Sequence, residues 1–124
     1  MPPLDIRLDV PADTRCLRTL RLAIAGAAEL AGFDEEAVGD VRIAVDELAA
    51  AVMSVADGGA RLIADVEVGR GRLRVVGRLT RPPGSTPQLS PIAQDVLPRT
   101  TDHHWLGARG TFGLERVTAT PTTP

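Results

Sequence analysis

The chain has 124 residues, of which 44% are hydrophobic and 24% are charged, and its formal net charge is -2. This length suits one compact domain, so we expect a single domain over residues 1–119 and a disordered tail at residues 120–124. The weakly acidic balance and the 2% aromatic content exclude a nucleic-acid binder that relies on phosphate neutralisation or base stacking.

Several side-chain types are missing, and their absence removes whole classes of chemistry. The sequence contains no Lys, Asn or Tyr, so it can supply neither a P-loop lysine nor a Schiff base. Cys16 is the only cysteine, which excludes an internal disulfide, and we expect it to be a small buried group on the first helix. The first residues lack the pattern of a signal peptide and no apolar run is long enough to cross a membrane, so we expect a cytoplasmic protein.

The N-terminal part reads as a strand followed by a helix. Apolar and charged side chains alternate over residues 4–10, which predicts a half-buried strand. Asp13 or Thr14 can cap a helix whose apolar stripe runs over residues 17–31 and ends at Gly32.

Three arginines recur at every third position near the start of this helix: Arg15, Arg18 and Arg21. The row is either a solvated helix face or a docking surface for an acidic partner, because guanidinium groups bind carboxylates through paired hydrogen bonds. Arg7 on the preceding strand is a possible addition to the same surface.

The strongest helical pattern lies over residues 38–55, where apolar side chains recur every three or four positions. Asp34 can cap this helix, the two glutamates after it complement the positive end of the helix dipole, and Gly58 is the expected left-handed residue at its end. Glu47 lies off the apolar stripe and can form one wall of a polar site.

The remaining chain predicts a β-hairpin over residues 62–79, a loop at 81–87, a short helix that begins at Ser90 and is limited by Pro98, and a second hairpin from Thr101. The resulting order is β-α-α-β-β-α-β-β. Because the helices are too few to cover both faces of a sheet, we expect an α+β two-layer sandwich with one antiparallel or mixed sheet and helices on one face.

Two motifs that suggest chemistry have simpler explanations. His103 and His104 are adjacent, so on a strand they face opposite sides and cannot bind one metal ion together. The glycine-rich segment 107–113 is followed by no helix, so a hairpin turn explains it better than a phosphate loop. We therefore predict no metal site.

The segment over residues 43–52, IAVDELAAAV, resembles the N-box region of the anti-sigma factor serine kinases, which belong to the GHKL superfamily of histidine kinase-like ATPases. The strand, the Arg-bearing helix and the Gly-Phe-Asp connector that precede it are also similar to that family. The resemblance covers about residues 4–80 and implies the Bergerat, or histidine kinase-like ATPase, fold with a shortened ATP lid.

In that family the glutamate that matches Glu47 is the catalytic base, and an asparagine one helical turn later holds magnesium against the ATP phosphates. Ala51 occupies that later position here, and a methyl group cannot coordinate a cation that requires oxygen ligands. The family's adenine-reading Asp-x-Gly-x-Gly turn should fall near residues 78–84, which contain no acid. The resemblance therefore implies a degenerate site in which Glu47 is vestigial, with no cofactor, or with ATP and magnesium only if the site still binds.

The function implied by the resemblance is that of an anti-sigma factor without ATP chemistry. Such a protein dimerises and sequesters a sigma factor until an anti-sigma antagonist releases it, and here the row Arg15, Arg18 and Arg21 would meet the sigma factor. Two alternatives stay open: an active serine-protein kinase whose magnesium ligand is rebuilt from Asp46 or Asp40, and a structural interaction domain unconnected with transcription.

Overall fold

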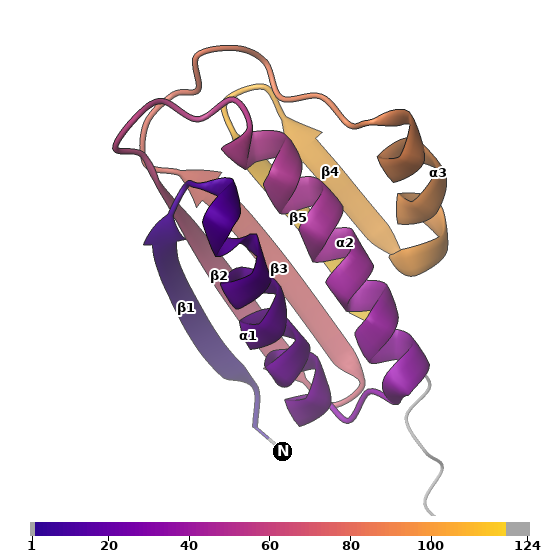
Figure 1. The fold of residues 1–124 in the computed structure, drawn as a ribbon. Coiled ribbons are helices and arrows are strands. Elements are labelled where there is room, and N and C mark those ends of the chain that lie inside the picture. The colour runs from indigo at the N-terminus through magenta and orange to yellow at the C-terminus, as the bar shows by residue number, and fades with distance from the viewer. Residues whose placement is uncertain (1, 119–124) are drawn as a thin grey trace, which may run out of the picture.

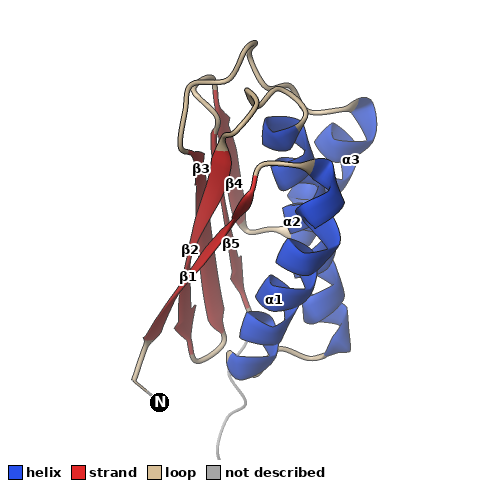
Figure 2. Cartoon of the chain, turned by 60° about the vertical axis from the view of Figure 1, so that its left-hand side comes forward, coloured by secondary structure: helices blue, strands red, loops and turns tan. Residues whose placement is uncertain are grey.

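The computed structural model describes residues 2–118, which form a five-stranded sheet with α-helices packed on one face of it (Figure 1, Figure 2). The elements are, in chain order, β1 (Leu4–Pro11), the 3₁₀-helix η1 (Thr14–Cys16), α1 (Leu17–Leu30), α2 (Glu35–Met53), β2 (Arg61–Gly69), β3 (Arg72–Leu79), α3 (Pro91–Thr100), β4 (His103–Gly107) and β5 (Thr111–Val117). The α+β class and the one-sided helical layer are as predicted. The predicted tail at residues 120–124 lies outside the described part of the chain.

The order of elements differs from the prediction at η1, which stands between β1 and α1. Asp13 caps this 3₁₀ turn by accepting a hydrogen bond from the backbone N–H of Arg15, whereas α1 begins after Cys16 without a side-chain cap. Asp13 and Thr14 therefore do not cap α1, because the chain makes one tighter turn before the helix starts. Cys16 lies in η1 and is only half-buried, so the expectation of a buried cysteine on the first helix is also wrong.

The sheet is antiparallel throughout, with the strand order β1-β2-β3-β5-β4. Both predicted hairpins are confirmed, and each turn contains a glycine with left-handed backbone: φ is 69° at Gly71 and 84° at Gly110. The glycine-rich segment 107–113 is thus a hairpin turn. β1 and β4 are the two edges of the sheet.

The core lies between the sheet and α2, which crosses the middle of the helical layer with α1 on one side and α3 on the other (Figure 1). The apolar stripe of α2 faces inward as predicted, and Val41, Val45, Leu48 and Val52 are fully buried. Asp34 caps α2 by accepting a hydrogen bond from the backbone N–H of Ala37.

Two helix ends differ from the prediction. α2 ends at Met53, because the N–H groups of Val55 and Ala56 bond to carbonyls three residues back rather than four. The left-handed residue that follows is Gly59 (φ 82°), not Gly58.

α3 does not end at Pro98, which lies inside the helix. A proline removes one backbone N–H, and here the loss falls in the last turn, where the Thr100 hydroxyl donates a hydrogen bond to the carbonyl of Val96. The Thr101 hydroxyl donates another to the carbonyl of Leu97. These contacts give partners to the last carbonyls of α3, which continues to Thr100.

The face of the sheet opposite the helices carries ion pairs between neighbouring strands. Arg7 pairs with Asp65 at 2.7 Å and Arg61 pairs with Asp9 at 2.6 Å. Trp105 lies directly over Gly113, where an added Cβ would overlap its ring, and the guanidinium carbon of Arg74 is 5.6 Å from the ring centroid. This face is therefore charged. The single tryptophan of the chain packs against it at Gly113, where the absence of a Cβ makes room for the ring.

The substitution Gly77→Ala should lower the free energy of unfolding by about 1–3 kcal/mol through overpacking. The reason is that a Cβ at Gly77 would overlap the ring of Phe112, which is fully buried. Gly26→Ala in α1 is the matched control, because its Cβ would meet nothing within 4 Å. It should raise the free energy of unfolding by about 0.5–1 kcal/mol. Denaturant unfolding measures both, and a loss of stability in both variants would contradict the packing described.

Candidate functional site

Glu47, the residue that matches the family's catalytic base, lies half-buried on α2 on the side away from α1. It follows Asp40 by seven residues, about two helical turns, so the two acids share one flank of the helix. Asp40 identifies that flank, because its carboxylate accepts a hydrogen bond from Nη2 of Arg116 in β5 at 3.0 Å. Figure 1 shows α3 on the same side of α2.

This flank is closed around the position where the family has its magnesium ligand. Ala51, one turn after Glu47, is 8% exposed, and α3 packs against α2. The connection before α3 is tied to the end of α2 by a 2.9 Å hydrogen bond from the N–H of Gly84 to the carbonyl of Val55. At the position one turn after Glu47, the chain therefore has a buried methyl group in place of an amide or carboxylate oxygen.

Asp46 and Asp40, the proposed replacement magnesium ligands, are each committed to an arginine. Asp46 turns toward α1, where it pairs with Nη1 of Arg21 at 3.1 Å, while Asp40 pairs with Arg116 at the other flank. Adjacent residues on a helix point about 100° apart, so Asp46 and Glu47 cannot converge on one ion. Within residues 2–118, no group of three or more His, Cys, Asp or Glu side chains could hold a metal ion.

The two histidines also diverge as predicted. His103 packs against Trp105 with the ring centroids 5.8 Å apart, whereas Nδ1 of His104 lies 3.1 Å from the hydroxyl of Thr101.

The predicted row of arginines is divided by intramolecular contacts. Arg15 is bound to Asp13 at 2.7 Å, and Arg21 is half-buried in its ion pair with Asp46. Arg18 is exposed and has no ion pair within the described chain. Arg7 lies on the far face of the sheet, bound to Asp65, so it does not extend this surface.

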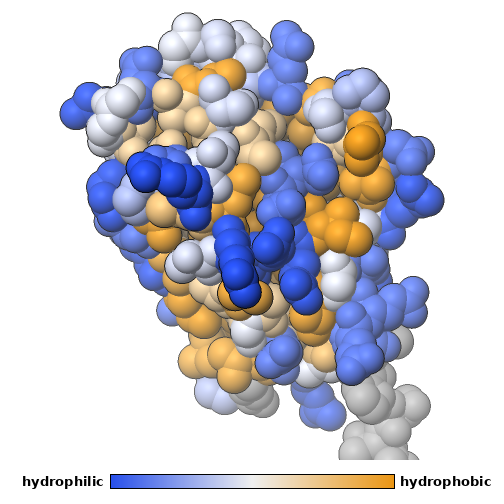
Figure 3. All heavy atoms as spheres, in the orientation of Figure 1, coloured by the Kyte–Doolittle hydropathy of each residue, from blue (hydrophilic) through white to orange (hydrophobic). Residues whose placement is uncertain are grey.

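A depression of about 420 Å³ lies beside the Arg21–Asp46 pair, and Gly39, Arg42 and Ile43 of α2 complete its lining. Gly39 faces open space, because a Cβ there would meet nothing within 4 Å. Ile43 is 45% exposed. In Figure 3, strongly hydrophilic side chains gather over the middle of α1 and α2 with hydrophobic ones beside them. The mixture of exposed apolar and cationic groups is suited to contact with a protein partner.

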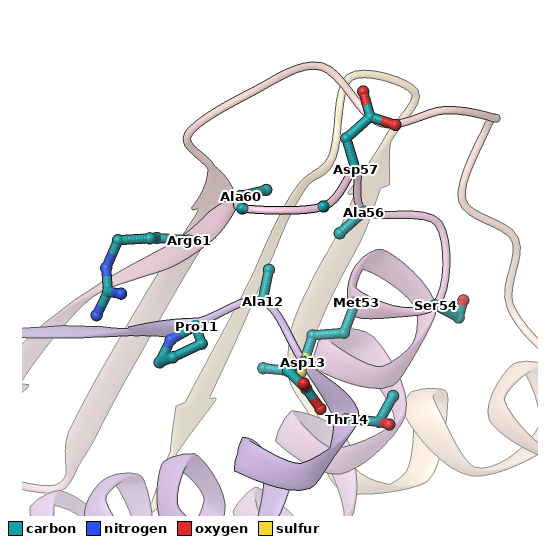
Figure 4. A pocket seen from close by; sticks show the side chains of 12 residues that line it. Pro11, Ala12, Asp13, Thr14, Met53, Ser54, Ala56, Asp57, Ala60 and Arg61 are labelled. Carbon is teal, nitrogen blue, oxygen red and sulfur yellow. The ribbon is translucent and has the colours of Figure 1, made fainter.

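A larger cavity, about 520 Å³, lies at the end of the molecule where the β1–η1 connection meets the α2–β2 loop (Figure 4). In Figure 4, Asp57 points away from Asp13, so the two carboxylates do not converge. Asp13 is already engaged, since Arg15 donates to it from its backbone N–H at 2.9 Å and from Nη2 at 2.7 Å. Nothing in this arrangement forms a catalytic constellation.

Comparison of the sequence with models of known protein families gives no match, and comparison with curated proteins gives none either. Among the described residues, no helix is long and apolar enough to cross a membrane.

Introducing the family's asparagine by Ala51→Asn should lower the free energy of unfolding by about 1–3 kcal/mol, because a polar side chain would be forced into a packed flank. Ala50→Asn is the control, since Ala50 is half-exposed, and it should change stability by only about 0.5 kcal/mol. We expect neither variant to bind magnesium and ATP in isothermal titration. An Ala51→Asn protein that is fully stable and binds the nucleotide would show that the flank is open.

The pKa of Asp13 lies at about 2, below its ordinary value of 3.8, because the Arg15 side chain and then its backbone N–H bond to the carboxylate. A lowered pKa in the folded state means that the ionised carboxylate stabilises the fold above pH 3.8 and that this stabilisation is lost as the pH falls toward about 2. Asp13→Asn should therefore lose less stability than the parent protein over that interval. Identical acid unfolding curves for the two proteins would refute this role.

Proposed function

We propose that this chain is a regulatory protein-binding domain of the anti-sigma factor type, with a histidine kinase-like ATPase fold that no longer performs ATP chemistry. It sequesters a sigma factor and is released by an anti-sigma antagonist. The observation that carries the proposal is the difference between two faces of α2. The flank with Glu47 has no oxygen ligand at Ala51, whereas the face toward α1 presents Arg42, Ile43 and an open depression to solvent.

The proposed partner surface combines cations with exposed apolar side chains. Arg18 and Leu22 of α1 are exposed near the depression, and Leu22 is 49% exposed. Interfaces commonly place apolar contacts inside a polar rim, and Arg is one of the residues that contributes most to binding. Arg18 and Arg42 are available to acidic groups of a partner. Arg21 is paired with Asp46, and this pair links α1 to α2 beneath the surface. This assigns the partner contact to both helices rather than to one row.

Arg18→Glu should weaken binding to the sigma factor at least about tenfold, since an attraction to an acidic partner becomes a repulsion. Arg78→Glu in β3 is the matched control, because Arg78 is equally an exposed arginine and lies on the face of the sheet opposite α1 and α2. Titration of both purified variants with each sigma factor encoded in the same genome measures the effect. Their thermal unfolding should match that of the parent protein, because Arg18 has no ion pair to lose.

Failure of every sigma factor to bind the parent chain would overturn the proposed function. Tight binding of magnesium and ATP, with phosphate transfer to a serine of the antagonist, would instead support the kinase alternative. Equal losses for Arg18→Glu and Arg78→Glu would leave the partner but move its contact away from the α1–α2 face.

A further inference from the structure

The face of the sheet opposite the helices is covered by no helix of the described chain. α1, α2 and α3 all lie on the other side of the sheet (Figure 2). Side chains on a strand alternate between its two faces, and Val75 and Leu79 of β3 are buried beneath the helices. The residues between them in β3 therefore point to the open face, where a partner can reach them.

An apolar strip crosses this open face at Trp105. The register pairs Trp105 of β4 with Gly113 of β5, and Gly113 with Val76 of β3, so the three residues form one row across neighbouring strands. A Cβ at Gly113 would overlap the indole ring, so the ring lies over β5 and reaches toward Val76. Trp105 and Val76 are both only half-buried, and the strip that they form is accessible from solvent.

Two arginines of β3 flank Val76 on the same face. The guanidinium carbon of Arg74 lies 5.6 Å from the centroid of the Trp105 ring, within the range of a cation–π contact. Arg78 is exposed, and its cross-strand neighbours, Ile63 and Thr111, carry no charge. The apolar strip is therefore bordered by a cation on each side along the strand.

Arg78 differs from the other arginines of the open face in having no ion pair within residues 2–118. Three of the others form ion pairs at 2.6–2.8 Å: Arg7, Arg61 and Arg72. Arg74 reaches the carboxylate of Glu115 only at 3.8 Å, and the same carboxylate oxygen lies closer to Arg72. The charge of Arg78 is thus unmatched, and that of Arg74 is weakly matched.

The carboxylates of this face that form no ion pair within the described chain lie toward its other end. They are Asp5 and Glu67, which stand opposite each other in the register of β1 and β2. Glu67 is opposite Arg74, but it is four positions along β2 from the row of Arg78, a distance of about 14 Å. The end of the open face with Arg78 is therefore cationic, and it complements a negatively charged partner.

We propose that Arg74, Val76, Arg78 and Trp105 form a docking surface for an acidic segment of a second protein partner. Carboxylates of that segment pair with the two arginines, and an apolar side chain of the segment packs on Trp105 and Val76. Tryptophan and arginine are the residue types that most often dominate the binding energy of protein interfaces.

The same features favour a protein over a nucleic acid as the occupant. The surface offers one aromatic side chain, whereas single-stranded nucleic acids bind to several stacking platforms in a continuous basic groove. The net charge of the whole chain is also negative, at -2. The sheet separates this surface from the α1–α2 face, so binding here does not depend on whether the chain binds a sigma factor.

Fluorescence of Trp105 measures this binding directly, because the chain contains one tryptophan and no tyrosine. The probe is a short synthetic peptide of glutamates around a central leucine, and the control peptide has lysines in place of the glutamates. At low salt the glutamate peptide should shift the emission to shorter wavelength, with a Kd below about 1 mM, and should protect Trp105 from quenching by acrylamide. No saturable change, or the same change with the lysine peptide, overturns the proposal.

Arg78→Glu should raise the Kd for the glutamate peptide at least about tenfold, because an attraction becomes a repulsion. Arg70→Glu is the matched control, since Arg70 is equally exposed and has no ion pair within the described residues, but it lies in the turn at the other end of β3. Both variants should unfold thermally as the parent protein does. Equal weakening by both would show attraction to the overall charge of the chain and contradict a defined surface.

Two further titrations separate this surface from other partners. Oligothymidylate that binds more tightly than the glutamate peptide, and loses its affinity with Arg78→Glu, would overturn the assignment to a protein. A sigma factor should bind the Arg78→Glu chain as it binds the parent, while the glutamate peptide binds that variant weakly. Failure of every sigma factor to bind overturns the proposed function alone, because the response of Trp105 to the peptide is measured without a sigma factor.

Discussion

The fixed rotation of α2 about its own axis is the constraint on which the rest of the structure depends. Val41, Val45, Leu48 and Val52 are fully buried against the sheet, so the helix cannot turn without exposing them. This rotation directs Asp46 toward Arg21 of α1 and Asp40 toward Arg116 of β5. Asp46 and Glu47 therefore point in different directions, and in the described part of the chain Glu47 has no second free carboxylate with which to form a site.

Periodicity and local capping chemistry were sufficient to predict much of the fold. The apolar stripe of α2, the caps at Asp34 and Ser90 and both hairpin turns are local features, and the structure confirms them. The predictions were wrong at helix ends, where short-range hydrogen bonds and not the apolar periodicity decide at which residue a helix begins or ends. The 3₁₀ turn before α1, the early end of α2 and the continuation of α3 through Pro98 are decided by single backbone and hydroxyl contacts that periodicity does not contain.

The candidate surface was less predictable because its members come from different helices. Arg15, Arg18 and Arg21 form a regular row in sequence, but the Arg21–Asp46 pair joins residues 25 positions apart and removes one member from the row. Gly39 could have been noticed in the sequence, because a glycine inside a strong helical pattern lowers helix stability by about 1 kcal/mol relative to alanine and so calls for an explanation. A Cβ at Gly39 would meet nothing within 4 Å, so close packing does not require this glycine, which lies in the lining of the depression.

The open face of the sheet meets solvent through charges that are matched within the chain. Arg7 pairs with Asp65 and Arg61 pairs with Asp9, so each of these pairs links β1 to β2 across the uncovered face. Exposed pairs of this kind contribute little to stability, and salt screens them. The cohesion of the domain therefore comes from the helical face of the sheet, and the charged face can vary its sequence at little cost to the fold.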